Sequence, residues 1–303
     1  MRLQKKLTYI NERGDSLSFN TDSQYHVNVS KDVSGLSDIE NDIFSITSMG
    51  QDGETFIGSR IVARDIEIVG HIKERDKSLA HRLRRRMNNI LNPQFKAILL
   101  FEFGDIRRVI DCTIATAPKF LPSPIFGQFV LQLSCLNPFW REDGEIRQDI
   151  ATWIGGFEFP IDRDDPPQGL EIPIEGTWEI GWRELSLIVN VYNAGDVRAG
   201  MRIEFRALGF LRNPTLLDVV TGQFIRINTE MQAGDVITVN TLWGQKSVTL
   251  RRGGVESDAF RFLDPDSSYL QLAVGDNMLR YDADENIENL DVVIFRNNLF
   301  LGV

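Results

Sequence analysis

The chain has 303 residues, of which 42% are hydrophobic and 25% charged, a profile of a folded globular protein rather than a disordered one. No apolar run approaches the roughly 20 residues that a membrane-spanning helix needs. The basic N-terminus has no apolar core behind it, so we expect neither a membrane protein nor export by a signal peptide. Cys112 and Cys135 are the only cysteines, which is too few for a disulfide framework, and we expect two buried, reduced thiols.

Charge is divided unevenly along the chain. Residues 1–142 hold 19 Lys and Arg against 17 Asp and Glu, a net charge of +2, whereas residues 143–303 hold 14 against 26, a net charge of −12. This asymmetry predicts two modules, 1–142 and 143–303, that face different neighbours. The acidic second half argues against nucleic-acid binding there, because phosphates would be repelled.

The first half is predicted to be mostly β, with one helix. Apolar residues alternate on both sides of a turn at residues 11–14, which indicates a hairpin, and a Gly-Gln-Asp-Gly turn at residues 50–53 precedes a long strand pattern. Residues 20–42 suit only short strands and loops. Further strands are expected at residues 97–103, 107–115 and 129–136.

The helix is expected at about residues 76–91. Asp76 or Ser78 can cap its start by accepting backbone N–H bonds. Leu79, Leu83 and Met87 recur at helical spacing and form one apolar stripe. Pro93 ends the helix, because the residue before a proline disfavours helical geometry.

The second half is predicted to be a β-sandwich. Residues 201–207 alternate without exception, so Met201, Ile203, Phe205 and Ala207 face a core. Many short strands at regular spacing, without a helical pattern between them, are typical of a sandwich. The expected strands lie at residues 185–191, 201–207, 224–227, 236–240, 247–250, 260–263, 269–274, 278–281 and 292–295.

Motifs for catalysis or for cofactor and metal binding are missing from the sequence. The chain has no H-E-x-x-H, C-x-x-C, G-x-S-x-G, G-x-G-x-x-G or G-x-x-x-x-G-K-[ST] motif, and its three histidines are not at metal-ligand spacing. We therefore expect no catalytic residue, no cofactor and no metal.

Arg82, Arg84, Arg85 and Arg86 spread around the polar side of the expected helix. A solvated helix face explains such a run. A charged contact in an assembly, either with the acids of a neighbouring subunit or with passing DNA, explains it as well. Arginine suits both partners, because its planar fork makes bidentate bonds to carboxylate or phosphate.

The order of several motifs resembles the distal tail protein family of phages with long non-contractile tails. In the first half these are the Gly-x-Asp-Gly turn, a helix with an Arg-rich face that ends in Ile-Leu-Asn-Pro at residues 90–93, and Cys-Leu-Asn-Pro-Phe-Trp at residues 135–140. In the second half, Asn-Val-Tyr-Asn-Ala-Gly-Asp at residues 190–196 and Gly-Asp-Asn-Met-Leu-Arg-Tyr at residues 275–281 are similar to the family's C-terminal sandwich.

The resemblance implies a non-enzymatic structural protein of the tail tip, or baseplate, made in the bacterial cytoplasm and located in the virion. Residues 1–142 would form a sandwich or split-barrel-like domain, with the helix, that closes into a six-fold ring. Residues 143–303 would form a galectin-like sandwich outside it. The ring would join the tail tube protein to the tail-associated lysin or hub protein and carry receptor-binding proteins. DNA would pass through its channel without specific binding.

Two rival functions stay open at this stage. In the first, the second domain is a carbohydrate-binding module that holds host wall sugars through Trp178, Trp182 or Trp243, because tryptophan stacks on sugar rings. In the second, carboxylates near these tryptophans hydrolyse glycosidic bonds, which requires two carboxylates about 5–10 Å apart.

Overall fold

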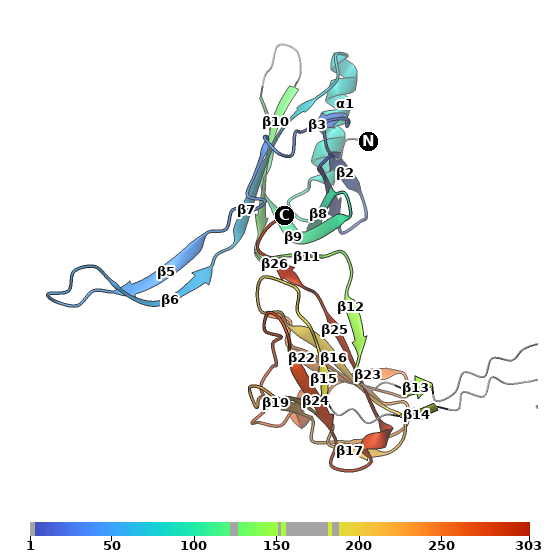
Figure 1. Cartoon of the computed structure of the whole chain (residues 1–303). Helices are drawn as coiled ribbons and strands as arrows, with labels where there is room; N and C mark the ends of the chain where they lie inside the picture. The colour runs from blue at the N-terminus through green and yellow to red at the C-terminus, as the bar shows by residue number, and fades with distance from the viewer. Residues whose placement is uncertain (1–3, 122–126, 151–152, 156–180, 184–187) are drawn as a thin grey trace, which may run out of the picture. The chain divides into compact units, whose positions relative to one another are not determined.

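The computed structural model describes residues 4–121, 127–150, 153–155, 181–183 and 188–303. The chain forms two compact units (Figure 1). Unit 1 comprises Met1–Gly144, Gly195–Val197 and Asn298–Val303; unit 2 comprises Glu145–Ala194 and Arg198–Asn297. Unit 2 is therefore inserted in the sequence between Gly144 and Asn298 of unit 1, and the short unit 1 segment Gly195–Val197 interrupts it. The domain boundary between residues 142 and 143 stays a prediction.

Unit 1 is built on one antiparallel sheet with the main strand order β2-β1-β8-β9-β10-β7-β3, to which β4, β11 and β26 add at the sides. Its strands are β1 (Lys6–Asn11), β2 (Ser16–Phe19), β3 (Tyr25–His26), β4 (Val33–Ser34), β7 (Arg64–Ile72), β8 (Ala97–Phe103), β9 (Ile106–Leu121), β10 (Gly127–Cys135), β11 (Trp140–Glu142) and β26 (Leu299–Phe300).

Alternation of side chains fills the core of unit 1. Along β7, Ile66, Ile68 and Ile72 are buried while the residues between them reach solvent to a greater extent. Phe19 from β2 packs against Phe129 from β10 with ring centroids 6.0 Å apart, so opposite parts of the sheet share one core.

The helix α1 (Lys77–Ile90) has the predicted cap and stripe. The side chain of Asp76 accepts a hydrogen bond from the Ser78 backbone N–H at 2.8 Å, and Leu83, Met87 and Ile90 are buried. The helix packs on β2 and β9. It ends before Asn92 and Pro93, as expected.

A separate hairpin, β5 (Asn41–Ile46) and β6 (Thr55–Ile61), pairs with no other strand in the described part of the chain (Figure 1). Its turn contains Gly50 and Gly53, whose φ angles of +81° and +80° favour glycine. We call residues 41–61 the arm. The sequence predicts the turn, but not that both strands would stand apart from the sheet.

Unit 2 has a six-stranded sheet of order β12-β25-β16-β21-β22-β23 and a four-stranded sheet of order β15-β24-β18-β19. Phe205 and Val239 from the first sheet share a buried core with Leu216 and Tyr281 from the second. The predicted fold class is therefore confirmed: mainly β, with one α-helix, a near-barrel sheet in unit 1 and packed sheets in unit 2.

The elements of unit 2 are β12 (Ile146–Asp149), β13 (Trp153–Gly155), β14 (Gly181–Arg183), β15 (Ile188–Asn190), β16 (Met201–Ala207), β17 (Leu211–Arg212), β18 (Thr215–Asp218), β19 (Phe224–Arg226), β20 (Glu230–Met231), β21 (Val236–Asn240), β22 (Ser247–Arg252), β23 (Val255–Asp258), η1 (Phe260–Phe262), β24 (Met278–Asp282), η2 (Ile287–Asn289) and β25 (Leu290–Arg296).

Two strand predictions in unit 2 are wrong. Residues 260–262 form the 3-10 helix η1, because the Asp258 carboxylate accepts a hydrogen bond from the Phe260 backbone N–H and turns the chain there. Residues 269–274 are not a strand, although Leu270 and Leu272 are buried in alternation. Their β pairing is limited to an isolated bridge between Leu272 and Ala199, and side chains such as Asn277 and Gln271 supply other hydrogen bonds.

Candidate assembly site

The arm exposes an unusual amount of apolar surface. Five large apolar side chains of its two strands are between 48% and 66% exposed, and Met49 at the turn is fully exposed. The five are Ile43, Phe44, Ile46, Phe56 and Ile57. So many exposed large apolar side chains on one short hairpin are typical of a site of contact with another molecule.

Both faces of the arm carry apolar side chains. Ile43 lies opposite Ser59, and Phe44 lies opposite Gly58. Successive residues of a strand point to opposite faces, so Ile43 and Phe44 lie on different faces of the hairpin. A two-stranded hairpin is marginally stable by itself in water. The arm is therefore a candidate surface for contact with another molecule.

Arg64 anchors the root of the arm. Its side chain is buried, and its guanidinium donates to the backbone carbonyls of Pro138 at 2.9 Å, Gly35 at 2.8 Å, Leu36 at 2.9 Å and Asp38 at 3.2 Å. Asp38 precedes the arm and Arg64 follows it, so one side chain ties both ends of the arm to unit 1. Burial lowers the pKa of Arg64 from its ordinary value.

The segment Asn298–Val303 completes this anchor. The Leu301 carbonyl also accepts a hydrogen bond from Arg64, and the Val303 carbonyl accepts one from the Ser37 hydroxyl at 2.8 Å. β26 pairs with β11, where Phe300 lies opposite the buried Trp140. The root of the arm is thus held by residues from both sides of the inserted unit 2.

The arginines of α1 are divided between two places. Arg82, Arg85 and Arg86 line an open groove of about 640 Å³ between α1 and the β1–β2 turn. Its other lining residues are Gly14, Asp15, Ser16, Asn89 and Ile90. Arg84 lies elsewhere, with its guanidinium 5.3 Å from the centroid of the Phe120 ring. We call the first set the arginine groove.

The arginine groove has no acidic partner within the described residues that neutralises it. None of Arg82, Arg85 and Arg86 forms an ion pair or hydrogen bond with a described side chain. Burial raises the pKa of Tyr25, and the positive charge of Arg86 opposes that rise. The groove is an electropositive surface that is open to a second molecule.

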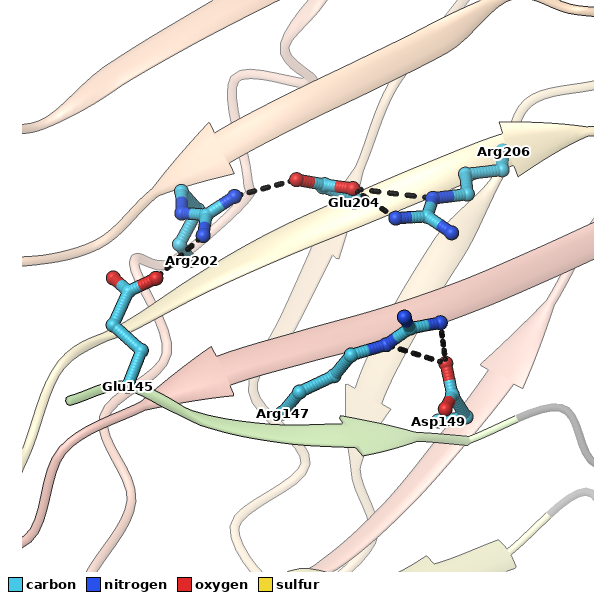
Figure 2. A network of polar contacts seen from close by, with 6 residues as sticks. All are labelled: Glu145, Arg147, Asp149, Arg202, Glu204 and Arg206. Carbon is cyan, nitrogen blue, oxygen red and sulfur yellow. Dashed lines mark hydrogen bonds and ion pairs between the residues drawn. The ribbon is translucent and has the colours of Figure 1, made fainter.

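The outer face of the six-stranded sheet in unit 2 is different, because its charges pair with one another (Figure 2). Glu204 accepts hydrogen bonds from Arg202 at 2.5 Å and from Arg206 at 2.7 Å. Arg202 also reaches Glu145 at 2.6 Å. This face is neutralised internally and offers few charges to a partner.

The three tryptophans predicted to contact sugar are not brought together in the described part of the chain. Trp243 is 77% exposed and carries Lys246 Nζ 4.8 Å from its ring centroid. Trp182 belongs to β14, and its side chain lies outside the description. Trp178 lies outside the described residues altogether.

Cys112 and Cys135 are both free and buried, in neighbouring strands of unit 1. Burial raises the pKa of Cys135 to about 12 and raises that of Cys112 further. Both are therefore unreactive thiols at neutral pH, because the thiolate is the reactive form.

Two further searches cover the described residues only. No helix in that part of the chain is long and apolar enough to cross a membrane. The same residues contain no group of three or more His, Cys, Asp or Glu side chains that could hold a metal ion.

Both units match models of phage tail proteins. The phage tail protein RIFT-related domain family matches residues 17–135. The C-terminal domain family of siphovirus-type tail components matches residues 194–296. Among curated protein sequences, none matches the chain.

Solved structures resemble the fold of nearly the whole chain. The Dit protein of phage SPP1, described as a paradigm of the hub adsorption apparatus in phages that infect Gram-positive bacteria, gives a TM-score of 0.66 at 16% identity. That similarity covers 96% of this chain and 98% of the SPP1 protein. A chain of the phage P2 baseplate in its activated conformation with Ca gives a TM-score of 0.51 at 12% identity, with 98% of both chains covered.

Proposed function

Because the chain belongs to the distal tail protein family of siphophages, whose members are non-enzymatic hub components of the tail tip, we propose that copies of unit 1 close into a hexameric ring there. A ring needs head-to-tail contacts, in which a projecting part of one copy meets a different surface of the next. The family places the chain in the phage tail tip, as expected, and it is a family of structural tail components.

The arm carries this proposal. Its apolar side chains are exposed on both faces, and no strand of its own copy pairs with it. Covering them on a neighbouring copy contributes about 25 cal/mol for each Å² of apolar surface removed from water. The anchored root at Arg64 holds the arm ready for this contact, so less order has to be gained on association.

In this proposal the ring contacts one protein on each side along the tail axis, and a further set of proteins on its outer surface. The tail tube protein lies on one side and the tail-associated lysin or hub protein on the other. Receptor-binding proteins attach on the outside. DNA passes through the channel without specific contacts, because unit 1 has nearly balanced charge. Electron microscopy of tails labelled with antibodies against this chain is expected to mark the tail end.

The ring is tested by the mass of the purified full chain in solution. Sedimentation velocity is expected to show a species of six chains, or about six times 34.5 kDa. The variant Phe44→Ser with Phe56→Ser is expected to remain a folded single chain, because it removes apolar contacts that exist only between copies. The matched control is Val220→Ser with Val255→Ser, two exposed apolar positions in unit 2 that should leave the ring intact.

A single chain at every concentration, together with absence of the protein from tail ends, contradicts the ring. The carbohydrate-binding alternative then takes its place, and Trp243 is the residue that favours it, because its indole is exposed and accessible to a sugar. Titration with cell-wall saccharides, followed by tryptophan fluorescence in the full chain and in Trp243→Ala, measures that activity directly.

A further inference from the structure

The arginine groove carries a net positive charge that no acid of the same copy neutralises within the described residues. Three arginines contribute +3 and Asp15 contributes −1, which leaves a net charge of +2 on the groove. Arginines elsewhere in the chain find carboxylates nearby, such as Arg60 with Asp42 and Arg141 with Asp111. The three arginines of the groove lie side by side, and none of them is paired with a described carboxylate. Like charges so close together repel each other.

The tip of the arm carries the complementary charge. The arm contains Asp42, Asp52 and Glu54 as acids and Arg60 as its only base. Asp42 and Arg60 form an ion pair with each other at 3.0 Å. The remaining charge of −2 is therefore concentrated in residues 49–54, which we call the arm tip.

Both acids of the arm tip are available to another molecule. Asp52 is exposed and forms no hydrogen bond or ion pair with any described residue. Glu54 accepts a hydrogen bond from the Ser45 hydroxyl and forms no ion pair with a described base. Met49, beside them, is also fully exposed.

The arm is long compared with the thickness of a packed layer. The seven residues of β6 span about 23 Å at about 3.3 Å per residue. That length exceeds the spacing of about 10 Å between packed layers, so the tip lies well beyond the root that Arg64 fixes.

Resting on the proposed ring, we infer that the arginine groove of each copy receives the acidic arm tip of a neighbouring copy. Arg82, Arg85 and Arg86 bind the carboxylates of Asp52 and Glu54, while the apolar strands of the arm supply most of the contact area. The charged contact sets which surface the arm tip meets, because charge complementarity across an interface gives specificity.

DNA is a weaker candidate for the same groove. Three arginines per copy, repeated around a ring, would hold phosphates tightly, and each such contact adds to a salt-dependent affinity. DNA that has to leave the virion through the ring would be retained by it. The paired acids on the outer sheet of unit 2 are also poor partners, since Glu145 and Glu204 already bind Arg202.

Charge exchange in the full chain tests the inference. Arg85→Glu with Arg86→Glu is expected to raise the concentration for half-assembly of the ring about tenfold, which is the size of two lost surface ion pairs and new repulsion. Asp52→Lys with Glu54→Lys is expected to have a similar effect. The variant with all four changes is expected to return to within about threefold of the wild type. Arg75→Glu, an exposed arginine just before α1 and outside the groove, is the matched control.

Failure of this inference differs from failure of the ring. Suppose that the wild type forms rings, but that the variant with all four changes loses as much assembly as the two double variants added together. The arm tip then does not bind the arginine groove, and the proposal of a ring is unaffected. If Arg85→Glu with Arg86→Glu assembles normally but loses affinity for a fluorescent 30-base-pair DNA duplex, the groove binds nucleic acid instead. If the wild type never forms rings, both proposals fall. Circular dichroism of each variant confirms that these exposed changes leave the fold intact.

Discussion

The outer face of α1 in unit 1 and the outer face of β16 in unit 2 both carry arginines, but only the arginines of β16 are paired with an acid of the same element. On β16, Arg202 and Arg206 bind Glu204, which lies between them in the same strand. On α1, Arg82, Arg85 and Arg86 have no acid of their own element, because the helix contains none. The alternation of a strand places an Arg-Glu-Arg row on one face, whereas the helix leaves its charges unpaired.

The comparison extends to apolar side chains and separates the roles of the two units. The sandwich of unit 2 closes its core within one copy, with Ile203, Phe205 and Ile294 fully buried. Unit 1 closes its own core too, but it holds out an arm whose apolar side chains stay in water. Unit 2 buries its apolar core within one copy, whereas in the proposed ring the arm of unit 1 is covered by a neighbouring copy.

Substitution of Arg64 is expected to have the largest effect on stability. The guanidinium of this arginine donates hydrogen bonds to backbone carbonyls and not to carboxylates. Arg64→Ala is expected to reduce the unfolding free energy of unit 1 by about 3–5 kcal/mol, because several buried carbonyls lose their donor at a cost of about 1–3 kcal/mol each. Denaturant unfolding of the full chain measures this change.

Arg64→Lys is the matched control, and it should restore part of the loss, since an ammonium keeps the charge but cannot reach every carbonyl. A loss below about 1 kcal/mol in Arg64→Ala would mean that water satisfies the carbonyls. The root of the arm would then not depend on this side chain.

A smaller effect is expected in unit 2, where Arg252 binds the buried Asp235 at 2.6 Å. Arg252→Ala should reduce the unfolding free energy by about 1–3 kcal/mol at pH 7, a value discounted because Arg252 is half exposed. Arg251→Ala, at the exposed neighbouring position, should change little.

The effect of Arg252→Ala should depend on pH. Burial alone raises the pKa of Asp235, but hydrogen bonds from Arg252 and from the Gln232 backbone outweigh it and leave the pKa below its ordinary value. The ion pair therefore stabilises the fold above the unfolded pKa of about 4 and loses its effect as pH falls through the lower folded value. Wild type and variant should converge in stability as the pH falls below the folded pKa of Asp235, and a difference that grows in acid would contradict this assignment.

The smallest effects distinguish the two arginine faces directly. Glu204→Gln removes the acid shared by Arg202 and Arg206 and should cost about 1 kcal/mol of unfolding free energy. Arg85→Gln with Arg86→Gln should change the stability of a single copy by less than about 0.5 kcal/mol, because no ion pair within that copy is lost. Equal losses in the two variants would show that the α1 arginines have partners in their own copy.

Elements that fill a core are the ones that sequence predicts well. The stripe of Leu83 and Met87 and the alternation of Met201 to Ala207 both appear as expected, because burial selects apolar residues at the period of the element. Phe260 and Leu272 mislead for the same reason, since they are apolar but held by turns and an isolated bridge. Local hydrogen bonds, which hydrophobic periodicity does not report, decide those segments.

The candidate site was only partly predictable. The four α1 arginines stand out in the sequence, but nothing there separates Arg84 from the three that line the groove. The arm was missed, because apolar residues on both faces of a hairpin leave no clear alternation. Arg64 had a signal that could have been used: it lies two residues before Ile66, at an inward-facing position of an apolar strand.

The path of the chain through Asn298–Val303 has a consequence for biosynthesis. Residues that fix the loop before the arm are separated from it by more than 230 positions, with all of unit 2 between them. A ribosome must therefore translate the inserted sandwich before Arg64 and Ser37 can donate hydrogen bonds to the carbonyls of Leu301 and Val303. The bonds from Arg64 to residues 35–138 can form earlier, but the root of the arm is complete only when residues 301–303 have been translated.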